Sequence, residues 1–182
     1  MRIYLTGFMA SGKSTVGPRV AERLGLGFLD LDDLIEARAG RSIPEIFAEQ
    51  GEAGFRRQEA EALRATARRE DVVVALGGGA LVEADNLAFA RAHGTVVYLR
   101  VPVEELARRL EGQAAERPLM QDASGTPLSP AAMRARIDSM LAARRRFYEQ
   151  AHVTVDAARP ADEVAAAVAR RVEKGMDEWR SG

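Results

Sequence analysis

The chain has 182 residues, of which 47% are hydrophobic, and a formal net charge of −1. This length and composition predict a single domain with a substantial core over residues 1–182. The balanced charge offers no basic field for nucleic acid, and the absence of cysteine excludes disulfides and thiolate zinc sites. No apolar run approaches membrane-spanning length, and no signal-like segment precedes the first strand. We therefore expect a soluble cytoplasmic domain. A monomer is also expected, although none of these observations fixes the oligomeric state.

Short apolar runs typical of strands alternate with helical patterns along the chain. The predicted strands are Ile3–Thr6, Phe28–Asp30, Val72–Leu76, Thr95–Leu99 and His152–Val155. The predicted helices cover most of Ser14–Leu24, Asp33–Arg38, Ile43–Glu49, Glu52–Arg68, Glu83–Ala92, Val103–Glu111, Pro130–Tyr148 and Ala161–Gly175. The alternation predicts an α/β fold with a parallel sheet and helices on both faces. Ligands of such sheets bind beyond the carboxyl ends of the strands.

The loop between the first predicted strand and helix, Gly7–Ser14, has the pattern G-x-x-x-x-G-K-[ST] of a P-loop. Backbone N–H groups of such a loop cradle the phosphates of a nucleoside triphosphate. Lys13 would reach the β- and γ-phosphates, and the Ser14 hydroxyl would bind Mg²⁺. Of the 26 lysines and arginines only two are lysine, so a chance match here is improbable. Pro18, early in the following helix, is unusual because proline removes a backbone donor.

Three aspartates, Asp30, Asp32 and Asp33, follow the second predicted strand. Carboxylates at a strand end can hold Mg²⁺ through water or accept the proton of an attacking hydroxyl. Aspartate is also favoured at helix N-termini, so capping is the alternative role. Three in four residues exceed what a cap requires, and we expect at least one to be functional.

Arg56 lies on the helix that begins near Glu52, three residues before Glu59. This spacing places the two side chains on one side of the helix, so Glu59 could hold the guanidinium in place. An ordinary surface pair is the alternative. Farther along, Gly77, Gly78 and Gly79 end the strand Val72–Leu76 and either bring the backbone close to a ligand or simply form a tight turn.

Arg108 and Arg109 end a helix and could stack on a purine or pair with exposed acids. The polar segment from Gly112 to Ser129 follows them and is long for a connector. We expect a lid over approximately residues 112–129, from which Arg117 could move onto phosphates, although a surface loop without a role is the alternative.

Arg144, Arg145 and Arg146 are separated by helix periodicity. The apolar stripe of Met133, Ile137, Met140 and Leu141 continues to Arg144, which should face inward, whereas Arg145 and Arg146 should face water. An inward arginine needs an anionic partner, either a protein carboxylate or one on a substrate. His93 and His152 have no companions at ligand spacing and are interpreted as structural.

Taken together, these segments resemble shikimate kinases. The matching pieces occur in the order of that family: Gly7–Thr15, Asp30–Asp32, Gly51 with Phe55, Arg56 and Glu59, Gly77–Gly79, Arg117–Leu119, and Arg144 with Tyr148. The resemblance implies a three-layer P-loop kinase fold, with a five-stranded parallel sheet and a mobile lid. It also implies transfer of the γ-phosphate of ATP to the 3-hydroxyl of shikimate, in chorismate and aromatic amino-acid biosynthesis.

The resemblance further implies roles for individual residues. Catalytic roles fall to Lys13, Asp32 and Arg117, and Mg²⁺ binding falls to Ser14 and, through water, Asp30. Shikimate contacts are implied for Asp32, Arg56, Gly77, Gly78, Gly79 and Arg144. ATP contacts are implied for Ala10, Ser11, Gly12, Lys13, Ser14, Thr15, Arg109, Arg117 and Arg159. Two departures from the family pattern are Ala10, where glycine is usual, and Pro18.

Two other functions fit parts of the sequence. A gluconate kinase also phosphorylates a hydroxy acid, but Asp30, Asp32 and Arg144 together favour shikimate. A P-loop switch or binding module that uses GTP would usually carry the guanine-specific motif N-K-x-D, which does not occur here.

Overall fold

The computed structural model describes residues 1–111, 118–122 and 124–180, with the backbone alone at 118 and 176–180. Five parallel strands form one sheet with the order β2-β3-β1-β4-β5. The strands are β1 (Arg2–Thr6), β2 (Gly27–Asp30), β3 (Val72–Ala75), β4 (Thr95–Arg100) and β5 (Val153–Asp156). The five-stranded parallel sheet predicted from the sequence is therefore confirmed.

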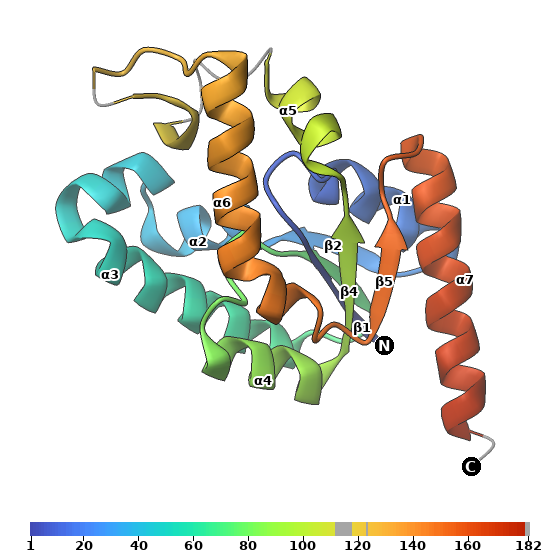
Figure 1. Cartoon of the computed structure of the whole chain (residues 1–182). Helices are drawn as coiled ribbons and strands as arrows, with labels where there is room; N and C mark the ends of the chain where they lie inside the picture. Colours follow the sequence, from blue (N-terminus) through green and yellow to red (C-terminus); the bar gives the residue numbers. More distant parts are fainter. Residues whose placement is uncertain (112–117, 123, 181–182) are drawn as a thin grey trace.

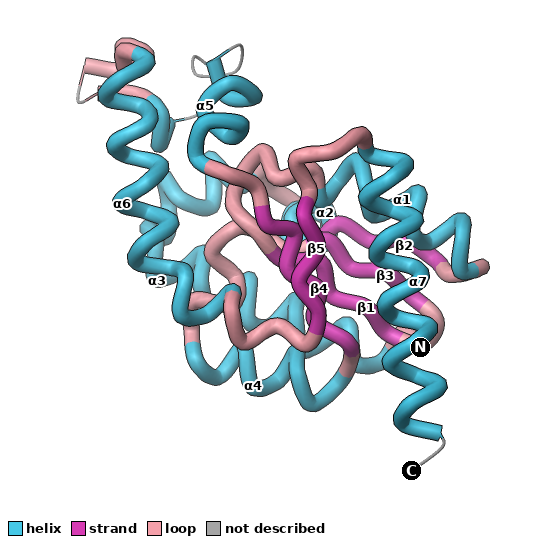
Figure 2. The backbone as a smooth tube through the Cα atoms, turned by 45° about the vertical axis from the view of Figure 1, so that its right-hand side comes forward, coloured by secondary structure: helices cyan, strands magenta, loops and turns pink. Residues whose placement is uncertain are grey.

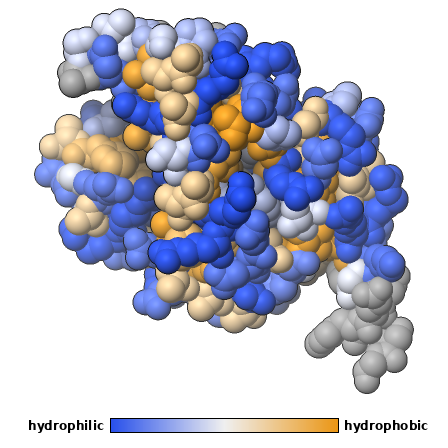
Figure 3. Space-filling view, in the orientation of Figure 1, coloured by the Kyte–Doolittle hydropathy of each residue, from blue (hydrophilic) through white to orange (hydrophobic). Residues whose placement is uncertain are grey.

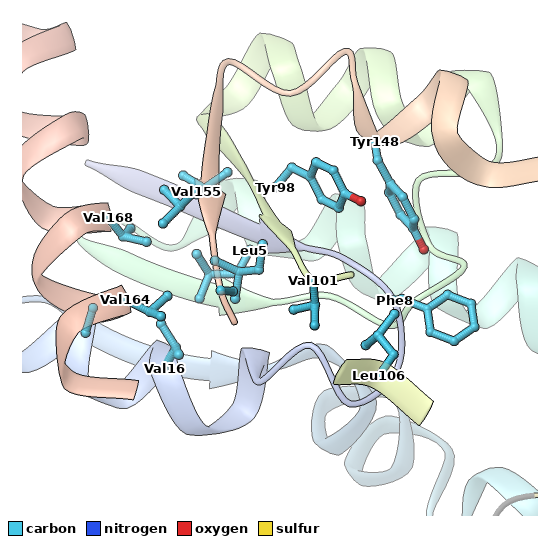
Figure 4. Close-up of a cluster of buried hydrophobic side chains, with 14 of the residues drawn as sticks. Leu5, Phe8, Val16, Tyr98, Val101, Leu106, Tyr148, Val155, Val164 and Val168 are labelled. Atoms are coloured by element: carbon cyan, nitrogen blue, oxygen red, sulfur yellow. The ribbon is translucent and has the colours of Figure 1, made fainter. Parts of the chain in front are cut away.

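Helices cover both faces of the sheet (Figures 1 and 2). They are α1 (Lys13–Leu24), α2 (Leu31–Ala39), α3 (Ile43–Ala65), α4 (Ala84–His93), α5 (Val103–Glu111), α6 (Pro130–Tyr148) and α7 (Ala161–Arg180), with short 3-10 helices η1 (Thr66–Arg68) and η3 (Pro118–Met120). One buried cluster joins the sheet to α1, α5, α6 and α7, and part of it is drawn in Figure 4. A second joins the sheet to α2, α3 and α4.

Two predicted helices, Ile43–Glu49 and Glu52–Arg68, are joined in α3. The break between them is present as a kink at Gly51, whose φ of 66° and ψ of −175° are not helical. Glycine adopts a positive φ without a steric penalty, so the chain can change direction here. A capping box of Ser42 and Glu45 fixes the first turn of α3, whose far end becomes η1.

The other predicted elements are present with shifts at their ends. Helix α2 begins at Leu31, two residues before its predicted start, because Asp30 accepts a hydrogen bond from the Asp32 backbone and caps it. Helix α1 continues through Pro18, and α7 extends to Arg180, beyond its predicted end. Among the described residues, no helix combines the length and apolar character needed to cross a membrane.

Gly94 lies where α4 returns to the sheet, and its lack of a side chain allows close packing on β1. Its φ of −178° is extended backbone that any residue can adopt. A Cβ at this position would lie 2.6 Å from the carbonyl oxygen of Arg2 and 3.0 Å from the Tyr4 ring. The constraint at Gly94 is therefore steric.

We expect Gly94→Ala to lower the free energy of unfolding by about 1–3 kcal/mol, because β1 backbone cannot give way to the methyl group. Gly175→Ala is the matched control: this glycine lies in α7 with nothing within 4 Å of a built Cβ. The control should raise stability by about 0.5–1 kcal/mol, since alanine favours helix over glycine. Urea denaturation of both variants tests this, and equal effects would show that the close approach is unimportant.

Candidate active site

The P-loop connects β1 to α1 at the carboxyl end of the sheet, beside a cavity of about 530 Å³. Most of the residues predicted to contact ATP, Mg²⁺ or acceptor line this cavity: Ala10, Ser11, Gly12, Lys13, Ser14, Thr15, Asp30, Asp32, Gly77, Gly78, Arg109 and Arg159. The cavity thus lies where the topology predicts a ligand site. Arg117, which was also predicted to contact ATP, lies outside the part of the chain that the structure describes.

The P-loop presents backbone donors at the start of α1. Gly12 is the N-cap residue, with a φ of 96°, and no side chain caps the helix. Its free N–H groups and positive dipole end favour a bound phosphate. The Lys13 ammonium lies 3.0 Å from the carbonyl oxygens of both Gly7 and Phe8. Ala10, which departs from the family pattern, has a φ of 59°, a conformation that costs alanine more than glycine.

Asp30 connects the P-loop to α2. Its Oδ2 accepts a hydrogen bond from Ser14 Oγ at 2.7 Å, and its Oδ1 accepts one from the Asp32 backbone at 3.1 Å. Capping was the alternative to a functional role for the three aspartates. Asp30 caps α2 and also lines the cavity, while its role in Mg²⁺ binding stays a prediction. Asp33, in contrast, is exposed. The cap on α2 directs the next aspartate, Asp32, to the cavity.

The Asp32 carboxyl has a pKa raised to about 6. Burial is the largest cause, and the negative charges of Asp30 and Glu59 add to it, while Lys13 opposes it. A carboxyl with a pKa near neutrality can accept a proton and release it again at physiological pH.

Arg56 and Glu59 form more than a surface pair. The Arg56 guanidinium donates to Glu59 Oε2 at 2.6 Å and lies 3.5 Å from Glu52. The Glu59 side chain is only 1% exposed, and burial raises its pKa, whereas Arg56 and then Arg144 lower it. A Cβ on Gly79 would lie 2.8 Å from Arg56 Nη2. The triple glycine therefore lets this ion pair approach the backbone directly.

Glu59 is a site residue that the sequence suggested only as a partner for Arg56. A Cβ on Gly77 would lie 3.0 Å from Glu59 Oε1 and 3.2 Å from Asp32 Oδ1, so both carboxylates approach the same glycine. The available signal was the three-residue spacing between Arg56 and Glu59, which says nothing about burial.

Arg144 reaches the same glycine loop from α6. Its Nη1 donates to the carbonyl oxygen of Gly78 at 3.3 Å, and the Tyr148 hydroxyl donates to the same oxygen at 2.6 Å. Arg144 is partly buried while Arg145 and Arg146 are exposed, which confirms the separation predicted from helix periodicity. The structure thus gathers Asp32, Arg56, Glu59 and Arg144 around Gly77–Gly79, although the roles implied for them stay predictions.

Arg109 joins the P-loop to the loop after β5. Its guanidinium donates to the carbonyl oxygens of Ala10 at 3.2 Å and Ala157 at 2.9 Å, and to Glu105 at 2.7 Å. Arg108 also pairs with Glu105 but is largely exposed. Both arginines therefore pair with an acid, and Arg109 also lines the cavity, while stacking on a purine stays a prediction.

The described part of the predicted lid, 118–122 and 124–129, is attached to the body of the protein. Met120 is fully buried in the core cluster, and Gln121 forms an antiparallel bridge with Pro127. Arg136 of α6 donates to the carbonyl oxygens of Leu119 and Gln121 at 3.2 and 3.1 Å. The opening and closing expected for residues 112–129 stay a prediction.

Comparisons with known proteins show which family this chain is similar to. The family model described as "Shikimate kinase" matches residues 9–173. A curated shikimate kinase from Salinibacter ruber is 59% identical over 164 residues, which cover 90% of this chain and 80% of the relative. A solved shikimate kinase from Acinetobacter baumannii, in complex with shikimate, is 36% identical with a TM-score of 0.84, over 96% of this chain and 93% of that one.

A gluconokinase from Sinorhizobium meliloti is also structurally similar, with a TM-score of 0.59 over 97% of this chain and 96% of that one. Its identity is only 22%, so this likeness concerns the fold alone.

The raised pKa of Asp32 predicts a pH-dependent gain in stability for Asp32→Asn. In the folded protein the charged form of Asp32 is penalised. The contribution of Asp32 to the free energy of unfolding is therefore most favourable below the ordinary pKa of 3.8, and it is lost as the pH rises through about 6. Asparagine carries no charge. The free energy of unfolding of the variant should therefore match that of the parent at about pH 4. At about pH 8 it should be higher by up to ~3 kcal/mol.

Thermal or urea unfolding across this pH range, without ligands, measures the effect. Asp33→Asn is the matched control, because it makes the same change one residue away at an exposed position. A stability difference for Asp32→Asn that does not vary with pH would contradict the proposed cause.

Proposed function

Because this chain belongs to the shikimate kinase family, we infer that it transfers the γ-phosphate of ATP to the 3-hydroxyl of shikimate. The products are ADP and shikimate 3-phosphate, within aromatic amino-acid biosynthesis. The observation that carries this conclusion is the family match over residues 9–173. The cluster of two arginines, the buried Glu59 and the partly buried Asp32 around Gly77–Gly79 supports it, since such a group of side chains suits an organic acid that carries hydroxyl groups.

In this proposal Arg56 and Arg144 bind the carboxylate of shikimate. Guanidinium groups can donate two parallel hydrogen bonds to a carboxylate, which fixes the acid in orientation as well as position. Glu59 holds Arg56 in place by accepting its hydrogen bond, and the carbonyl oxygen of Gly78 accepts a hydrogen bond from Arg144. The small residues at Gly77 and Gly79 let the ring approach the backbone.

Asp32 would face the hydroxyl that attacks. As that oxygen forms its bond to the γ-phosphorus, the bond to the bridging oxygen of ADP breaks and the hydroxyl proton is lost. The Asp32 carboxylate either takes that proton or orients the hydroxyl by accepting its hydrogen bond, and its raised pKa supports the first role.

Positive charge around the γ-phosphate would come from several groups, because phosphoryl transfer depends mainly on positioning and charge stabilisation. Lys13 and the N-terminus of α1 supply it from the P-loop side, and Arg117 is proposed to supply it from the lid. Arg109 and Arg159 would contact the nucleotide at the other end of the cavity, where both line the wall.

Mg²⁺ is proposed to bind next to Ser14 and Asp30. The paired hydroxyl and carboxylate, 2.7 Å apart, provide the hard oxygen donors that this ion prefers. The described residues contain no group of three or more His, Cys, Asp or Glu side chains that could hold a metal ion, which is compatible with an ion held mainly by phosphates and water. When bound, Mg²⁺ neutralises charge on the β- and γ-phosphates.

An ADP-release assay with shikimate, gluconate or no acceptor tests the function. We expect release only with shikimate, since the acceptor cluster follows the family in every residue that the resemblance assigns. Preference for gluconate would instead assign the related kinase activity. Release at an equal rate without any acceptor would indicate a nucleoside triphosphatase.

Arg144→Ala should raise the KM for shikimate by about 10- to 100-fold, the loss expected for a charged hydrogen bond, and leave the KM for ATP nearly unchanged. Arg144 is the sharper choice because Arg56→Ala would also leave Glu59 buried without its partner. Arg146→Ala, an exposed neighbour on α6, is the control and should change neither value. An equal loss of affinity for both substrates would argue against a role in acceptor binding.

A further inference from the structure

A second cavity of about 510 Å³ lies between α6, β4 and β5. Its volume is within the range of small-molecule sites. Within the described chain it shares no lining residue with the cavity at the P-loop. Helix α6 separates the two regions, because Arg144 reaches towards the glycine loop while Arg145 lines this second cavity.

The floor of the second cavity is apolar. Tyr98, Val101 and Leu141 line it, and each is at most 9% exposed. Pro102 and Val103 continue this surface to the start of α5. Figure 3 shows hydrophobic surface beside α6 in this part of the molecule, bordered by hydrophilic surface. The floor can therefore bury an apolar group of moderate size.

The rim carries two positive and two negative side chains, Arg100, Arg145, Glu149 and Asp156. None of the four forms an ion pair with another described residue. Arg145 and Glu149 are four residues apart on α6, a spacing at which opposite charges often pair. Opposite charges that form no ion pair with one another, above an apolar floor, complement a ligand that carries both a carboxylate and an ammonium group.

Tyr98 links this cavity to the acceptor side of the active site. Its ring stacks on that of Tyr148 with centroids 4.9 Å apart and planes at 19°, and Figure 4 shows the two rings side by side. The Tyr148 hydroxyl donates to the Gly78 oxygen, which also accepts from Arg144. Two contacts thus connect Tyr98 to the loop of Gly77–Gly79.

We propose that this cavity binds a small zwitterion with a large apolar side chain, as in an apolar amino acid, and that its occupancy alters the affinity for the acceptor. The carboxylate lies at Arg100 and Arg145, the ammonium at Glu149 and Asp156, and the side chain on Tyr98. Binding is independent of the proposed function. Only its effect on acceptor affinity rests on shikimate being the acceptor.

The first experiment measures binding of L-phenylalanine to the full chain by calorimetry, without ATP or shikimate. Phenylpropionate lacks the ammonium and phenethylamine lacks the carboxylate, and each should bind at least about ten-fold more weakly, the factor of one lost charged contact. Arg145→Gln and Glu149→Gln should weaken L-phenylalanine binding to a similar degree, whereas the neighbouring Arg146→Gln should not. No saturable binding, or equal binding of phenylpropionate, would overturn the proposal.

The second experiment measures shikimate affinity by calorimetry with and without saturating L-phenylalanine. We expect a change of about five-fold or more, and shikimate should change the affinity for L-phenylalanine by the same factor. Tyr148→Phe, which deletes the hydroxyl bound to Gly78, should reduce this mutual effect while L-phenylalanine still binds. Binding of L-phenylalanine with unchanged shikimate affinity would overturn the coupling. A protein that binds L-phenylalanine but does not phosphorylate shikimate would contradict the proposed function instead.

Discussion

The buried carboxylate of Glu59 needs positive charge around it, and the acceptor side of the active site is arranged to meet this need. Arg56 hydrogen-bonds to it from the same helix, and Arg144 attracts it from α6. Two cations therefore lie close to one buried anion, and Glu52 approaches Arg56 from the exposed side at 3.5 Å. Asp32 lies at the other side of Gly77, where it adds a carboxylate suited to hydroxyl groups. One buried acid thus organises the group of side chains that is proposed to bind a hydroxylated organic acid.

The features that depend on local pattern could be predicted from the sequence. The P-loop requires only two glycines, a lysine and a serine at fixed spacing between a strand and a helix, and the structure has this arrangement at Gly7–Ser14. The inward position of Arg144 followed from an apolar stripe repeating with the period of a helix. The alternation of strands and helices likewise predicted a parallel sheet, because parallel strands require crossover connections.

Features that depend on contacts between distant segments could not be predicted in this way. The burial of Glu59 arises because the glycine loop after β3 lies against α3, and no spacing within α3 reveals this. The positive φ of Ala10 depends on how the P-loop closes between β1 and α1. The stacking of Tyr98 on Tyr148 joins residues fifty positions apart on different elements. Strand order belongs to the same class, since it records which segments meet in space.

Arg109 has a consequence for nucleotide recognition. Its planar guanidinium donates hydrogen bonds to the carbonyl oxygens of Ala10 and Ala157. The Glu105 carboxylate also accepts a hydrogen bond from the guanidinium and neutralises its charge. These bonds fasten the P-loop to the loop after β5, and both segments line the cavity proposed to bind the nucleotide. A nucleotide that binds as proposed would find these two segments already joined, so less conformational entropy would be lost on binding. Affinity for the phosphate donor would accordingly depend on a rigid brace as well as on contacts with the donor itself.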